Sequence, residues 1–181
     1  MSKPTPAQPV KLVFSVFSSS PEKIDEALKM LAGLYGEPDF ISAVLPFDYT
    51  SYYSAEMGES LVRRFLSMEK LIRPELLPAI KLSTNKLEDQ LTCGRGRLVN
   101  IDPGYLSAAH LILATGKGYS HRPHLHSGIY ADLTLIYARG KFCRLPWTYP
   151  DYADEKQLLM FGRIRSKYLL QLKAAASAGI N

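Results

Sequence analysis

The sequence predicts a single α+β domain built on a mainly antiparallel sheet with three main helices. Three strand-like runs follow one another in the second half, at 97–102, 108–115 and 129–138, and short links of this kind join antiparallel neighbours. Three further stretches carry apolar residues at helical spacing. No repeat or linker interrupts the 181 residues, a length that suits one hydrophobic core. We therefore expect a flexible N-terminal tail at 1–10 and one domain at 11–181.

The first part of the chain predicts a strand, a helix and a second strand. The run KLVFSVFSS at 11–19 is apolar and rich in β-branched and aromatic residues, as buried strands are. Ser20 is a suitable N-cap before Pro21, and Gly36 ends the helical pattern. The apolar positions between these caps are Ile24, Ala27, Leu28, Leu31 and Leu34. The run DFISAVLPF at 39–47 predicts the second strand.

The middle of the chain gives a weaker pattern. Residues 49–57 and 61–72 alternate imperfectly, and the second run fits a strand or a helix, so both stay open. Helical spacing returns from Pro74 to Thr92 and ends at Cys93-Gly94. The apolar positions of this helix are Leu77, Ile80, Leu87 and Leu91.

The chain closes with a hairpin and a long helix. ARGKF predicts a tight turn at Arg139-Gly140 into a short strand near Phe142. A helix over about 154–176 has one apolar face, made of Leu158, Phe161, Tyr168, Leu169 and Leu172, and an opposite basic face, made of Lys156, Arg163 and Lys167. Arg165 falls within the apolar face. Such an arginine either extends to the rim or is buried against a carboxylate, and we expect Arg165 to pair with an Asp or Glu.

Positive charge gathers in the second half of the chain, although the net charge is only +5. Residues 1–92 carry ten Lys or Arg against twelve Asp or Glu, whereas residues 93–181 carry twelve against five. This asymmetry favours an anionic partner, either a phosphorylated small molecule such as a nucleotide or a nucleic acid. A basic surface that only keeps the protein in solution fits the same counts.

The cysteine spacing, the apolar runs and the first ten residues indicate the cellular compartment and the class of protein. Cys93 and Cys143 lie far apart without CxxC or histidine spacing, which argues against a zinc site or a disulfide framework and favours a reducing cytoplasm. No apolar run approaches the roughly 20 residues of a membrane helix, so we expect no membrane partner. The first ten residues hold three prolines and no apolar core, unlike a secretory signal. The oligomeric state stays open.

The established nucleotide and catalytic motifs are not matched. Gly116-Lys117 matches only part of a phosphate-binding loop, because the leading glycine and the Ser or Thr after the lysine are missing. In TNKLED, Glu88 stands where the guanine-reading Asn-Lys-x-Asp motif needs aspartate. No G-x-S-x-G, H-E-x-x-H or dinucleotide glycine pattern occurs.

Polar residues nevertheless concentrate around two aspartates and the loop between them. Strand alternation places Asp102 and Asp132 on the polar sides of two strands. The intervening loop contains no acid and carries Lys117, Tyr119, His121 and Arg122. If these segments adjoin, the aspartates could hold Mg²⁺ or activate water, with His121 as general acid or base.

In that arrangement Lys117, Tyr119 and Arg122 would bind phosphate oxygens. Three plainer interpretations compete: Asp102 opens a turn, Asp132 pairs with an arginine, and His121 lies at the surface. His124 and His126 alternate as transition-metal ligands could, but the pattern supplies no third ligand at a set spacing.

Four stretches, VNIDPGYL, ATGKGYSHRPHL, GIYADLTLIY and PWTYPDY, together resemble a bacterial family known as domain of unknown function 4416. EMG, RRFLS and IKLSTNKLE also fit, so the resemblance covers nearly the whole chain. It implies no established activity, and the GTP-binding label that some members carry is not supported by the failed motif tests. The positions that match the family pattern are Asp102, Gly104, Tyr105, Ser120, His121, Arg122, Tyr130, Ala131, Pro146, Trp147, Tyr149 and Tyr152.

Two functions of different class follow. In the first, the domain binds a nucleotide or another phosphorylated molecule and possesses metal-assisted phosphoryl or hydrolytic chemistry, carried by Asp102, Asp132 and His121. In the second, it binds RNA without chemistry, through the basic face of the last helix and stacking aromatics that include Trp147 and Tyr149. Convergence of the polar groups in a cleft would favour the first, and a flat basic aromatic surface the second.

Overall fold

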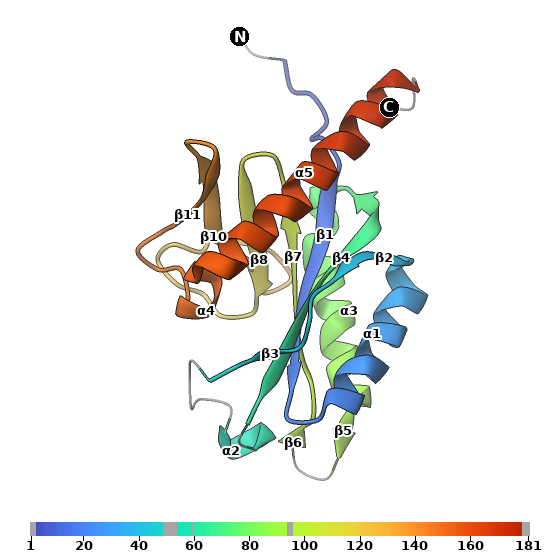
Figure 1. Cartoon of the computed structure of the whole chain (residues 1–181), viewed down its shortest axis with the longest axis vertical. Coiled ribbons are helices and arrows are strands. Elements are labelled where there is room, and N and C mark those ends of the chain that lie inside the picture. The colour runs from blue at the N-terminus through green and yellow to red at the C-terminus, as the bar shows by residue number, and fades with distance from the viewer. Residues whose placement is uncertain (1–2, 49–53, 59, 94–95, 179–181) are drawn as a thin grey trace.

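The computed structural model describes residues 3–48, 54–58, 60–93 and 96–178, and within them the fold is built on one nine-stranded antiparallel sheet (Figure 1). The strand order is β11-β10-β8-β7-β1-β4-β2, with β3 also on β4 and β9 also on β10. The strands are β1 (Val10–Ser18), β2 (Pro38–Ile41), β3 (Leu45–Pro46), β4 (Val62–Ile72), β7 (Asn100–Leu106), β8 (His110–Thr115), β9 (His124–His126), β10 (Ile129–Ala138) and β11 (Lys141–Arg144). The predicted α+β class is confirmed.

Helices cover both faces of this sheet. They are α1 (Pro21–Tyr35), α2 (Ser54–Met57), the 3-10 turn η1 (Pro74–Leu76), α3 (Leu77–Gln90), α4 (Pro150–Ala153) and α5 (Glu155–Ser177). α1 and α3 pack on one face around Phe14 and Leu66. α5 crosses the other face over Val13 and Phe65 (Figure 1). A small separate hairpin joins β5 (Thr92–Cys93) to β6 (Gly96–Arg97).

The first predicted strand and helix are confirmed. Ser20 caps α1 by accepting a hydrogen bond from the Lys23 N–H, and Gly36 ends the helix with φ of 89°. Leu34 was expected on the buried face but is exposed, because it lies at the edge of the α1 stripe that packs on the sheet. The second predicted strand divides into β2 and β3, and both parts pair with β4.

The structure resolves the ambiguity at 61–72 in favour of a strand. β4 pairs with β1 on one side and with β2 and β3 on the other, so its backbone groups find partners in the sheet rather than within a helix. Most of the neighbouring run at 49–57 lies outside the described residues, and its last four residues form α2. The helix predicted from Pro74 is present as η1 followed by α3, with the four expected apolar side chains buried.

The second half matches the prediction except in its boundaries. The strand predicted at 97–102 is divided, because β6 ends at Arg97 and β7 starts at Asn100. Arg139 and Gly140 have φ of 52° and 80°, the left-handed pair that a two-residue hairpin turn requires. The last helix is present with Asp154 as its N-cap, and the short helix α4 precedes it.

Arg165 has different partners from those expected. Its Nε donates to the Ala108 carbonyl at 2.8 Å, and its guanidinium lies 3.4 Å from the centroid of the Tyr137 ring. A carbonyl in the turn between β7 and β8 and an aromatic face therefore satisfy the half-buried cation in place of the expected carboxylate. A buried arginine that does pair with an aspartate is Arg63, with Asp151.

Candidate functional site

The sheet splits between two of its central strands. β7 and β8 pair only over Gly104–Leu106 and Leu111–Leu113, although β7 begins at Asn100 and β8 continues to Thr115. At the last pair the backbones approach closely, since a Cβ added to Gly104 would lie 2.5 Å from the Ile112 carbonyl oxygen. The start of β7, before Gly104, and the end of β8, after Leu113, do not pair with each other.

Side chains of α3 bind the backbone groups that the split leaves on β7. The Ile101 N–H donates to Glu88 Oε1 at 2.7 Å, and the Ile101 carbonyl accepts from Lys81 Nζ at 3.0 Å. Alternate residues of a strand point their N–H groups to the same side, so residue 103 would supply the next donor toward β8. That residue is Pro103, which has no N–H. The sequence thus ends the β7–β8 ladder at Gly104.

A cleft of about 990 Å³ lies at this split. Its walls come from α3, β7, the end of β8, the loop after β8, β10 and the segment around α4. Among its described lining residues are five cations, Arg63, Lys81, Arg97, Lys117 and Arg122, and five acids, Glu88, Asp89, Asp102, Asp132 and Asp151. A cavity of this volume is in the range of small-molecule sites, although its lining is more highly charged than is usual for them.

The α3 and β7 wall is a network of ion pairs. Lys81 Nζ lies 3.4 Å from Asp102 Oδ1 and 3.9 Å from Glu88 Oε1. Arg97 donates to Glu88 at 3.0 Å and holds Glu56 through two further bonds. Burial raises the pKa of Glu88, and these cations and the Ile101 N–H oppose that rise. Asp102, whose side chain is 33% exposed, is far more accessible than Glu88, at 5%, which also lines the cleft.

The opposite wall is organised by Arg122. Its Nε donates to Asp132 at 2.8 Å, its Nη2 to the Tyr149 hydroxyl at 2.8 Å, and its Nη1 to the Lys117 carbonyl at 3.1 Å. Burial opposes charging here, yet the bonds to Tyr149 and Asp132 raise the pKa of Arg122. The Arg122 side chain is only 7% exposed, and these three bonds fix its plane and use three of its five N–H donors.

The floor of the cleft contains a buried arginine in an aromatic cage. Arg63 is ion-paired with Asp151, which lies at the start of α4. Four rings lie within 5.5 Å of its guanidinium carbon: those of Phe17, Phe47, Phe65 and Tyr152. Burial raises the pKa of Tyr152, so this phenol is neutral at physiological pH. The pair fixes α4, and with it Tyr149, against the sheet.

The structure brings together some of the sequence-predicted site residues and not others. Asp102, Lys117, Arg122, Asp132 and Tyr149 all line the cleft. The cleft walls do not include Tyr119, His121 or Trp147 among the described lining residues. His121 stacks on Trp147 at 4.9 Å between ring centroids, with its Nε2 3.8 Å from Asp132 Oδ2. The imidazole therefore lies behind Asp132.

The two aspartates expected to share a cation have different partners. Asp132 pairs with Arg122, as the plainer interpretation proposed, whereas Asp102 pairs with Lys81 and accepts from the Asn100 amide at 2.7 Å. β8 separates β10 from β7 in the sheet, which corresponds to about 10 Å where the strands pair, and β7 has already parted from β8 at Asp102. The described residues include no group of three or more His, Cys, Asp or Glu side chains that could hold a metal ion.

Sequence reasoning missed six of the ten charged residues among the described cleft lining. Lys81, Asn85 and Glu88 follow one another at helical spacing on α3, and this signal was visible as a polar stripe on a predicted helix. Arg63 and Asp151 left no such signal, since 88 residues separate them. Only the register of β4 in the sheet and the position of α4 bring them into contact.

The family model described as Domain of unknown function (DUF4416) matches residues 8–168. The chain therefore belongs to this family, as the resemblance in its motifs indicated. No curated protein matches the sequence, and no solved structure matches it. No helix among the described residues is long and apolar enough to cross a bilayer.

Proposed function

We propose that the cleft binds a small phosphorylated molecule of nucleotide size. The observation that carries the proposal is the oriented Arg122 guanidinium beside Lys117 at the wall of a cleft of about 990 Å³. Planar forks of N–H donors match phosphate oxygens, and an arginine already fixed by three bonds loses little freedom when it binds one. The anionic group of the ligand would therefore lie at this wall.

The loop beside this wall lets a ligand approach the backbone. A Cβ added to Gly116 would meet no heavy atom within 4 Å, and Gly116 itself lines the cleft. Tyr149, which is 49% exposed, presents an aromatic ring at the same wall. A phosphate at Lys117 and Arg122 with a planar group against Tyr149 would use both features.

Chemistry at the site is the second part of the proposal. Asp102 on the opposite wall would hold a Mg²⁺ ion that accompanies the phosphate, or activate a water molecule for hydrolysis. Lys81 and Asn100 orient this carboxylate. His121 would act through Asp132 rather than at the reacting group, because it lies behind that residue.

Calorimetry with nucleoside phosphates and sugar phosphates, with and without Mg²⁺, tests the proposal. Lys117→Gln should weaken binding by about tenfold or more, the usual loss for one charged hydrogen bond to phosphate. Gly116→Leu should obstruct the cleft while thermal stability stays unchanged. Lys141→Gln on β11 is the matched control, since Lys141 is exposed and lies away from the cleft lining. Asp102→Asn should remove only the Mg²⁺-dependent part of the affinity.

RNA binding is the second candidate, because Tyr119 is 70% exposed and Trp147 and Tyr149 are exposed as well. Such rings stack on unpaired bases without sequence preference. If wild-type protein binds none of the small ligands but binds single-stranded RNA tightly and in a salt-sensitive way, the function belongs to this second class.

A further inference from the structure

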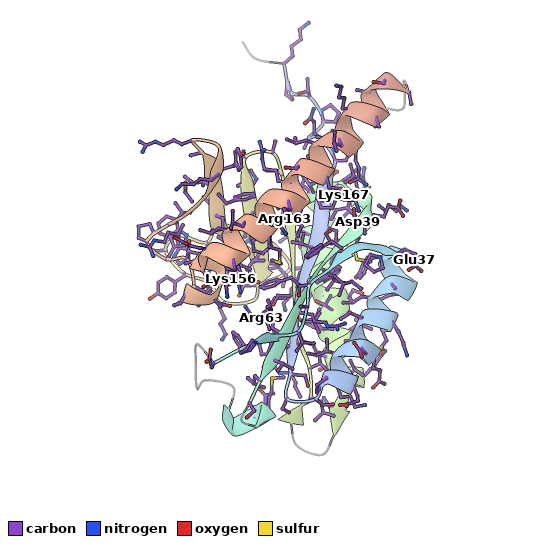
Figure 2. The ribbon with its side chains drawn as sticks, in the orientation of Figure 1. Glu37, Asp39, Arg63, Lys156, Arg163 and Lys167 are labelled. Atoms are coloured by element: carbon purple, nitrogen blue, oxygen red, sulfur yellow. The ribbon has the colours of Figure 1, made fainter. Side chains whose placement is uncertain are left out.

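The outward face of α5 combines positive charge with exposed leucines. Lys156, Arg163 and Lys167 lie along the helix (Figure 2), and Lys173 continues the series about 1.7 turns later. Leu159 and Leu170 are each 68% exposed on the same side. No acidic residue follows Glu155 in α5. We call these six residues the outward basic-leucine face. Its positive charge attracts anions, and its two leucines leave apolar surface exposed.

The two leucines are in register with each other. They lie eleven residues apart, which corresponds to three helical turns and about 16 Å along the axis. The other side of α5 is fully used, since Phe161, Ile164 and Tyr168 are buried against the sheet. Leu159 and Leu170 thus contribute nothing to the core.

Asp39 borders this face next to Lys167, near the middle of α5 (Figure 2). Lys167 Nζ is 3.4 Å from Asp39 Oδ2, and the buried Lys11 also pairs with this carboxylate. Asp39 is therefore neutralised within the fold, while Lys156 and Arg163 in the N-terminal half of α5 are exposed.

We infer that this face docks the protein on an anionic lipid bilayer. Lys and Arg close to an anionic leaflet each strengthen binding by about fivefold, and leucines among them enter the headgroup boundary. A protein partner fits less well, because a helix face of about 300 Å² is far below the roughly 800 Å² per partner of a stable interface. An RNA partner fits less well too, because it would place Leu159 and Leu170 against charged phosphate groups. Our expectation of no membrane partner rested on the lack of a spanning segment, which docking at the bilayer surface does not require. Docking also does not depend on the ligand of the cleft.

Cosedimentation with phosphatidylcholine vesicles, with and without about one third phosphatidylserine, tests this inference. Wild-type protein should bind the anionic vesicles and not the neutral ones. Lys156→Gln/Arg163→Gln should weaken binding by about 25-fold, from two basic contacts at about fivefold each. The matched control is Lys29→Gln/Lys86→Gln, which removes two exposed charges from α1 and α3 on the opposite face.

Leu159→Ser/Leu170→Ser separates insertion from charge attraction. Both side chains are exposed, so the variant should fold normally and lose at least about tenfold in vesicle affinity. Equal weakening by the control pair would assign the binding to net charge and overturn the inference. Failure to bind anionic vesicles, or tight RNA binding unaffected by the leucine variant, would overturn it as well.

Discussion

The two faces of the sheet are made by the same strands but bury different chemistry. On β1, Leu12, Phe14 and Val16 point to α1 and α3 and belong to a wholly apolar cluster. The alternate residues Lys11 and Ser15 point to the other face and are equally buried. β4 repeats the contrast, with Leu66 and Met68 on the first face and Arg63 and Ser67 on the second.

The contrast indicates which face of the sheet has residues that do not serve stability alone. A buried charge costs desolvation free energy, and an apolar pair of similar volume often serves stability as well or better. Burial lowers the pKa of Lys11 even though Asp39 binds it. The charged face is also the one whose arginine floors the cleft. We conclude that α1 and the apolar side of α3 supply the stable platform, whereas the face with buried charges, together with Lys81 and Glu88 of α3, organises the site.

Arg63→Ala would test this contrast most strongly. Loss of the guanidinium strands buried Asp151 and empties a four-ring cage, so the free energy of unfolding should fall by about 3–5 kcal/mol. Denaturant titration measures the change. Arg64→Ala is the matched control, because its partner Asp25 is exposed and the loss should stay below about 1 kcal/mol. Equal losses would mean that the Arg63 pair has no special role.

Gly104→Ala tests the point where the sheet splits. The added methyl group would meet the Ile112 carbonyl at 2.5 Å, which forces β7 and β8 apart and should cost about 1–3 kcal/mol. Gly116→Ala, with open space around its Cβ, should change stability by less than about 0.5 kcal/mol. A tolerated Gly104→Ala would show that the strands part there without strain.

Arg165→Ala should have a moderate effect. The variant loses one charged hydrogen bond and one cation–π contact but strands no carboxylate, so we expect a loss of about 1–2 kcal/mol in thermal unfolding. Arg163→Ala, on the exposed side of the same helix, should change stability by less than about 0.5 kcal/mol. A loss for Arg165→Ala as large as that for Arg63→Ala would point to a buried anionic partner.

The smallest effect is a change in pH dependence at Glu88. Because burial holds its pKa above the ordinary value, the native state binds the proton first as pH falls, and the native state gains stability between those two pKa values. Glu88→Gln removes this titration while its amide oxygen can still accept from Ile101. The stability of wild type relative to Glu88→Gln should therefore rise on acidification, as urea titrations from neutral to mildly acidic pH would measure. A constant difference would show that burial does not raise this pKa.

Local patterns in the sequence determined most of the elements. Hydrophobic periodicity, the Ser20 cap and the Arg139-Gly140 turn specified β1, α1, α5 and the last hairpin, because each depends on residues a few positions apart. The family membership also follows from the sequence. The same local rules placed Asp102 and Asp132 on polar strand sides near a cationic loop, and both residues line the cleft.

Only the tertiary structure decided how these charged side chains pair and which apolar side chains stay exposed. Strand register brings Arg63 to Asp151, carries Lys81 and Glu88 to the unpaired Ile101 backbone, and gives Arg165 a carbonyl instead of a carboxylate. The packing of α5 likewise leaves Leu159 and Leu170 outside the core. A side chain's partner depends on segments distant along the chain, and periodicity carries no information about them. Some of the polar residues of the site can therefore be predicted from the sequence, whereas their pairing depends on how the strands align in the sheet.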